Sequence, residues 1–217
     1  MSISLLLFKT TCHICRTKDE HLATLEEKQQ QFNSFFLIAF PIKANLLPLD
    51  DAQLHHSYDD FETNMPYAFK IAGEMSEIQS QALKPLRNLG DKLTELVDYL
   101  QFQAQKIDLM MSYILQQQDE PQYQAQAIKF GGGGVIVSQR EHVDLGSKTA
   151  IKMFLETESA AIYCYAEAIA CEQIDDCYEV SYVYTHIREQ DQELLVRASL
   201  HLQTQALRKV KEKNKAQ

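Results

Sequence analysis

The sequence Ile128-Lys-Phe-Gly-Gly-Gly-Gly-Val-Ile-Val137 contains four of the seven glycines in the 217-residue chain. Apolar and β-branched runs follow it at 150–155, 160–171 and 177–187, with turn-like stretches between them. These runs are rich in Tyr, Val and Ile, the residue types that are enriched in strands. The pattern predicts an antiparallel meander of short strands after residue 126.

The glycines themselves, Gly131 to Gly134, allow two interpretations. Glycines within a strand mark a bend, a bulge or a close approach to a neighbouring backbone. A phosphate-binding loop would instead need a following Gly-Lys-Ser/Thr and the N-terminus of a helix. Because the sequence continues into a predicted strand, the structural interpretation is favoured.

A C-terminal helix is predicted from Glu189 to about Lys213. Acids near its start and bases near its end match the helix dipole. The last 21 residues carry six Lys or Arg against the single acid Glu212, in a chain whose net charge is −9. A general nucleic-acid binder is therefore not expected. The helical period is carried by Leu194, Leu195, Ala198, Leu202 and Leu207.

Upstream of the glycine stretch, apolar residues alternate at spacings of three and four from residue 86 to 115. Eight of the nine a and d positions over four heptads are apolar, which is typical of a coiled coil. Gln103 is the polar exception. We therefore predict one long helix over 72–118 that makes an oligomeric coiled coil. Its predicted oligomerisation residues are Leu86, Leu89, Leu93, Leu96, Leu100, Ile107, Met110 and Ile114.

The e positions of this register, Gly90, Val97, Ala104 and Met111, widen the apolar face. A bundle of more than two helices, or a coil that also packs on its own β-domain, would bury that flank. One long helix in an ordinary monomeric bundle is the alternative. Leucine at both a and d leaves dimer, trimer and tetramer open.

Residues 1–70 are predicted to form a poorly defined segment with short helices or strands, because Pro41 interrupts the apolar stretch at 35–47 and Pro48 follows it directly. The apolar run at 3–8 is too short for a signal sequence or a membrane span. The sequence thus predicts a cytoplasmic protein with no membrane insertion and with reduced cysteines.

The order of glycine-rich strand, meander and C-terminal helix resembles the PilZ domain, a small β-barrel known as a bacterial receptor for cyclic di-GMP. The matching stretches are 128–137 and 185–197, and the heptad helix ending at 106–115 resembles the atypical, tetramer-forming PilZ subfamily. The resemblance implies an α+β fold, with a six-stranded antiparallel PilZ-like barrel and C-terminal helix at 126–217. It also implies a parallel helical bundle, a homotetramer and a role in bacterial motility, pilus or virulence regulation.

Ligand-binding PilZ domains carry Arg-x-x-x-Arg before the first strand and Asp/Asn-x-Ser-x-x-Gly on it. Here no arginine lies between Arg87 and Arg140. Aligned on Gly134, Lys129 occupies the Asp/Asn position and Gly131 the Ser position. Lysine attracts phosphate but cannot accept hydrogen bonds from guanine. Cyclic di-GMP is therefore disfavoured as a ligand, and a non-standard site using Lys129, Gly131 and Gly134 is the alternative.

Two other constellations could bind a metal, Cys12 with Cys15, and His55 with His56 in an acidic stretch. Cys12 and Cys15 have the C-x-x-C spacing of half a zinc site or a redox pair, but the sequence has no second such pair. No spacing such as His-Glu-x-x-His fixes a geometry around His55 and His56, so metal binding is a second alternative. No nucleophile elbow or local Cys-base signature is present. The sequence predicts a non-enzymatic protein without a cofactor, whose partners are copies of itself and an unidentified signalling protein.

Overall fold

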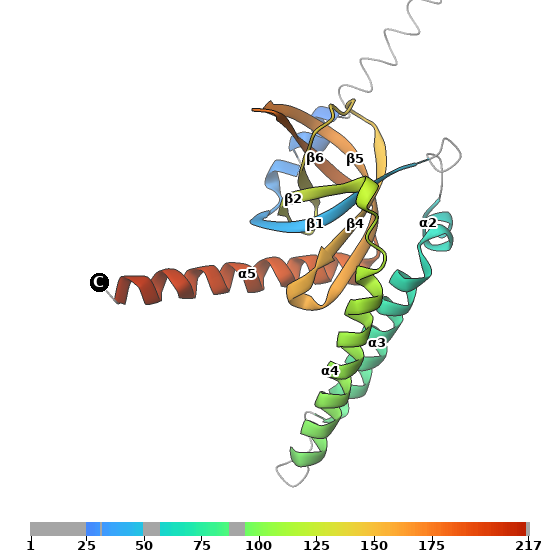
Figure 1. The fold of residues 1–217 in the computed structure, drawn as a ribbon, viewed down its shortest axis with the longest axis vertical. Coiled ribbons are helices and arrows are strands. Elements are labelled where there is room, and N and C mark those ends of the chain that lie inside the picture. Colours follow the sequence, from blue (N-terminus) through green and yellow to red (C-terminus); the bar gives the residue numbers. More distant parts are fainter. Residues whose placement is uncertain (1–24, 31, 50–56, 87–93, 216–217) are drawn as a thin grey trace, which may run out of the picture.

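A computed structural model describes residues 25–30, 32–49, 57–86 and 94–215 of the chain (Figure 1). Its centre is a closed antiparallel barrel with the strand order β1-β2-β3-β6-β5-β4. The helix α5 (Glu189–Lys215) follows the last strand and packs on the barrel. The predicted six-stranded barrel with a C-terminal helix is confirmed. The strands are β1 (Ile38–Pro48), β2 (Gln124–Phe130), β3 (Gly134–Gln139), β4 (Lys148–Leu155), β5 (Ala160–Ile174) and β6 (Cys177–His186).

The barrel interior is filled by side chains that alternate along the strands, since successive residues of a strand point to opposite faces. Leu195, Ala198 and Leu202 of α5 add their buried face to the same core. This burial of apolar surface is the main force that holds the barrel together. Fully buried members include Phe130, Val135, Val137, Ile151, Met153, Ile162 and Val180.

The first barrel strand comes from the N-terminal segment, which differs from the prediction that the barrel lies within 126–217. Strand β1 pairs with both β2 and β4 and so closes the barrel. Pro41 lies where the register of β1 against β2 shifts, between Ala39 and Ile42, and Pro48 ends the strand. Proline is tolerated at such bulges and strand ends because its missing N–H is not needed there.

The glycine stretch forms a hairpin turn between two strands rather than a bend within one. Strand β2 ends at Phe130, β3 begins at Gly134, and the Gly131 N–H donates to the Gly134 carbonyl at 3.1 Å. A Cβ on Gly131 would collide with the Phe36 carbonyl oxygen. Glycine is therefore needed at this position for close approach to a neighbouring backbone.

The described residues between β1 and β2 form the α-helices α2 (Tyr58–Asn64), α3 (Tyr67–Leu86) and α4 (Thr94–Gln116). A capping box between Ser57 and Asp60 starts α2. Helices α3 and α4 lie side by side, project from the barrel and run in opposite directions (Figure 1). We call this pair the hairpin.

The structure thus divides the predicted single helix over 72–118 into α3 and α4. The sequence between them includes Asn88 and Gly90, two residue types with low helix propensity. The heptad pattern did not reveal the division, because apolar spacings of three and four residues describe a helix face and not the direction of the chain.

Candidate oligomerisation surface

Helix α4 exposes far more apolar surface than a helix of a monomeric protein usually does. Only four of its 23 residues are charged: Glu95, Asp98, Lys106 and Asp108. Large exposed apolar patches mark interaction sites on proteins. We call the following nine side chains, each between 37% and 72% exposed, the α4 surface: Leu96, Tyr99, Leu100, Phe102, Ile107, Leu109, Met110, Tyr113 and Ile114.

One flank of α4, beside its a positions, is covered by the chain itself. Met111 and Leu115 are buried, and Val97 and Ala104 are half-buried. Leu115 belongs to a cluster with Phe61 and other residues of α2, α3, β4 and β5. The described residues at the e positions therefore pack against other residues of the same chain. The described apolar side chains at the a and d positions of α4 stay exposed.

The structure gathers five of the eight predicted oligomerisation residues on this surface. Leu86 ends α3, with its side chain outside the described part, and Leu89 and Leu93 lie outside the described residues. The prediction omitted four exposed residues at the c and g positions. Their apolar character was readable in the sequence, but the heptad count considered only a, d and e. The omitted residues are Tyr99, Phe102, Leu109 and Tyr113.

An aromatic cluster fixes the base of the hairpin to the barrel. Phe61 of α2 is fully buried, and its ring centre lies 5.9 Å from that of Tyr163 and 5.0 Å from that of Tyr165, both on β5. Nearby, Arg188 donates to the Phe69 carbonyl of α3 at 3.1 Å and pairs with Asp191 at 2.8 Å. Burial raises the pKa of Asp191, although Arg188 opposes this effect.

His186, at the end of β6, provides a pH-dependent test of this cluster. Its ring contacts Tyr58, Phe61 and Tyr165, and burial, followed by the charge of Lys148, lowers its pKa. The unfolded chain therefore binds a proton at this histidine more readily than the folded chain does. The contribution of neutral His186 to the free energy of unfolding is complete above about pH 6.5 and is lost as the pH falls below that value.

We expect His186→Gln to reduce this loss of stability. Urea unfolding at pH 7.5 and at pH 5 measures the free energy of unfolding of both proteins. The decrease between the two pH values should be smaller in the variant than in the wild type. An equal decrease would show that His186 does not contribute.

The three predicted ligand residues come together at the β2–β3 turn, but the chain covers the turn itself. Gly131 and Gly134 are buried, whereas Lys129 is exposed on β2. A Cβ on any of the four glycines would meet another part of the chain. The covering residues are Phe36 over Gly131, Val196 over Gly132, Phe35 over Gly133, and Phe32 and Tyr182 over Gly134.

The candidate metal ligands Cys12, Cys15, His55 and His56 lie outside the described residues. Within the described part, no group of three His, Cys, Asp or Glu side chains is placed to hold a metal ion. No described helix combines the length and the apolar composition needed to cross a bilayer.

Comparison with known proteins bears on the fold. No protein-family model matches the chain, and no curated protein matches it. Among solved structures, a pathogenic protein from Xanthomonas campestris superposes with a TM-score of 0.52 and 11% identity, covering 80% of this chain and 91% of that one. It is described as a new tetrameric PilZ domain that self-assembles through an unusual helical bundle.

The chain has a PilZ-type fold. The barrel expected from the resemblance in sequence is thereby confirmed, and at 11% identity the likeness establishes the fold alone. The inhibitor of motility MotI/DgrA from Bacillus subtilis also matches, with a TM-score of 0.36 and 16% identity over 38% of this chain and 42% of that one. In this PilZ-type fold the hairpin is inserted between the first two barrel strands.

Proposed function

We propose that this protein is a non-enzymatic, cytoplasmic PilZ-type signalling protein that assembles with copies of itself and acts through protein contacts. The regulation of bacterial motility, pili or virulence is the setting that the PilZ resemblance implies. The observation that carries the proposal is the α4 surface, with nine large apolar side chains exposed on one helix.

The size of this surface favours association. Full burial of one large apolar side chain is worth about 1.5–3 kcal/mol, so the part still exposed is worth roughly 1 kcal/mol per residue. The nine residues of one copy then contribute on the order of 9 kcal/mol, against an association cost of about 4–15 kcal/mol. Since each partner adds its own surface, assembly is favoured over the separated chains.

The arrangement of the nine residues favours two neighbours for each α4. On a helix with 3.6 residues per turn, the exposed a and d residues and the c and g residues form two stripes whose centres are about 100° apart. One partner helix covers one such stripe. In a closed ring, neighbours are about 90° apart around each member of a tetramer and about 60° apart in a trimer. A tetramer therefore fits best, and the Xanthomonas protein is described as one.

We do not propose a cyclic dinucleotide receptor, because the chain's own phenylalanines cover the β2–β3 turn and the paired arginines are absent from the sequence. Calorimetry with cyclic di-GMP tests this choice. Micromolar binding that is lost in Lys129→Ala would restore the receptor interpretation.

Sedimentation velocity at several protein concentrations tests the assembly. We expect one boundary that sediments faster than a single chain. Its sedimentation coefficient should fall only at dilutions where the assembly dissociates. A sedimentation coefficient equal to that of one chain at every concentration would contradict the proposal.

A further inference from the structure

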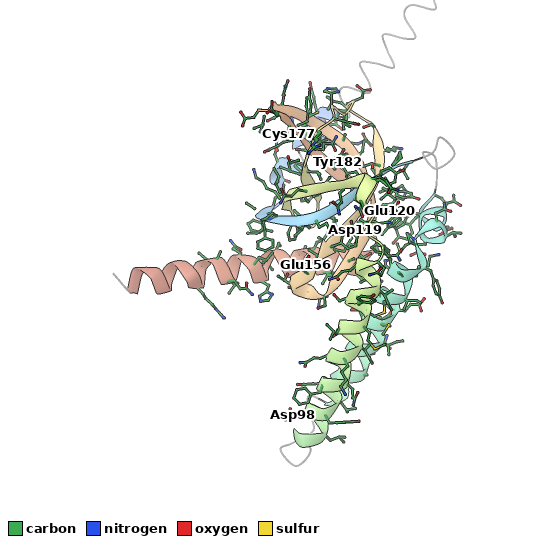
Figure 2. The ribbon with its side chains drawn as sticks, in the orientation of Figure 1. Asp98, Asp119, Glu120, Glu156, Cys177 and Tyr182 are labelled. Atoms are coloured by element: carbon green, nitrogen blue, oxygen red, sulfur yellow. The ribbon has the colours of Figure 1, made fainter. Side chains whose placement is uncertain are left out.

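We propose that a buried polar clamp sets the direction in which the hairpin leaves the barrel and thereby sets the geometry of the assembly. The clamp consists of Asn45 on β1, Lys152 on β4, and Asp119 and Glu120, which follow α4. In Figure 2 the two acidic residues lie where α4 meets the barrel. The inference rests on the proposed function, because it concerns how that assembly is positioned.

Asn45 joins the barrel to the chain just after α4. The residue is fully buried, and its Nδ2 donates to Asp119 Oδ1 at 3.0 Å and to the Glu120 carbonyl at 3.2 Å. Its Oδ1 accepts the Glu120 N–H at 3.1 Å. One side-chain amide thus satisfies both backbone groups of Glu120, which a shifted chain could not do.

Lys152 holds the same segment from the neighbouring strand. Asn45 and Lys152 are direct partners in the β1–β4 register. The Lys152 ammonium is almost fully buried and donates to Glu120 Oε1 at 2.6 Å and to the Gln118 carbonyl at 3.1 Å. A buried charge is tolerated only where it is paired and hydrogen-bonded, so the ammonium requires this placement of residues 118–120.

Asp119 completes the network. It accepts hydrogen bonds from Lys43 at 2.7 Å and from Gln124 at 2.8 Å as well as from Asn45. Burial raises the pKa of Asp119, but the hydrogen bonds from Lys43, Asn45 and Gln124 outweigh it and lower that pKa. The carboxylate therefore stays ionised at neutral pH and keeps its acceptor role.

The polar character of the clamp matters for direction. Apolar contacts are non-directional, whereas hydrogen bonds to a buried amide and ammonium fix distance and angle. Helix α4 has 23 residues and is about 35 Å long, so a tilt of about 10° at its base moves its tip by about 6 Å. That sideways displacement is more than half of the roughly 8–10 Å that separates the axes of packed helices. A loosened clamp would thus move the tip of the α4 surface away from its neighbours.

Two clamp variants and two controls test the inference. Asn45→Ala removes three hydrogen bonds, and Lys152→Met removes the ammonium while keeping an unbranched side chain of similar length to the lysine stem. Lys129→Ala is the control, because Lys129 is an exposed lysine on β2, the strand next to β1, and lies outside the clamp. Lys152→Arg keeps the charge and should restore the wild-type behaviour. Near-UV circular dichroism reports whether the barrel stays folded in each variant.

Light scattering measures the assembly of these proteins. We expect the clamp variants to need at least tenfold more protein than the wild type for half-assembly, and the two controls to stay within about twofold. Each substitution is also introduced into a protein that carries Leu100→Glu and Ile107→Glu, which separate the copies. Small-angle X-ray scattering of these single chains should show a wider range of hairpin directions in the clamp variants only.

The inference is overturned if folded Lys152→Met assembles like the wild type. It is also overturned if single chains with Lys152→Met give the same X-ray scattering as the Leu100→Glu and Ile107→Glu protein that keeps Lys152. A wild-type protein that is itself a monomer would instead refute the proposed function. In that case the scattering comparison still decides whether the clamp directs the hairpin.

Discussion

Replacing Leu100 and Ile107 with glutamate is expected to convert the assembly into single chains that remain folded. Both residues are exposed in one copy, at 37% and 44%, so folding does not require their apolar character. In the assembly the same positions would bury unpaired carboxylates from every copy, at a cost of several kcal/mol per charge. We therefore expect association to weaken by at least about a thousandfold, which corresponds to about 4 kcal/mol.

The matched control places the same charges elsewhere on α4. Gln101 and Gln105 are exposed on the polar side of the helix. The double variant Gln101→Glu and Gln105→Glu should therefore keep the wild-type molar mass. Assembly that survives the first pair of substitutions, or that is lost with the second, would show that the α4 surface is not the contact.

Phe61→Ala should produce the largest loss of stability among substitutions at the base of the hairpin. The Phe61 ring is fully buried among Tyr58, Tyr163, Tyr165 and His186. Its removal leaves a cavity in which few neighbours can relax, and such substitutions cost about 3–5 kcal/mol. Urea unfolding measures this change in the free energy of unfolding.

Tyr58→Ala provides the comparison, because Tyr58 lies beside Phe61 but is 43% exposed. We expect it to cost about 1 kcal/mol, the typical value for a single substitution. If Phe61→Ala costs no more than Tyr58→Ala, the aromatic cluster does not hold the hairpin on the barrel.

Much of the barrel could be predicted from the sequence because its later strands are local in pattern. The apolar runs at 150–155 and 177–187 correspond to β4 and β6, and α5 begins at the predicted residue. The sequence allowed short helices or strands in residues 1–70 but did not indicate that β1 belongs to the barrel, because its prolines resemble strand breakers. Its pairing with β2 also spans more than 70 residues, so no local signal connects the two strands.

The candidate site could be predicted in part. The a and d stripe identified Leu96, Leu100 and Ile107 as surface-forming residues, because a heptad pattern records which face of a helix is apolar. The same pattern did not distinguish one helix from two that lie side by side. The clamp left no recognisable signal, since Asn45 meets Glu120 only after the barrel and the hairpin have formed.

Light scattering for molar mass, with and without cyclic di-GMP, is the decisive measurement of the proposed tetramer. We expect one discrete species of four times the 24.9 kDa chain mass, unchanged by the dinucleotide. A dimer or trimer would refute the ring of four that we infer from the two stripes of α4. A single chain at all concentrations would contradict the proposal that this PilZ-type protein works as an assembly.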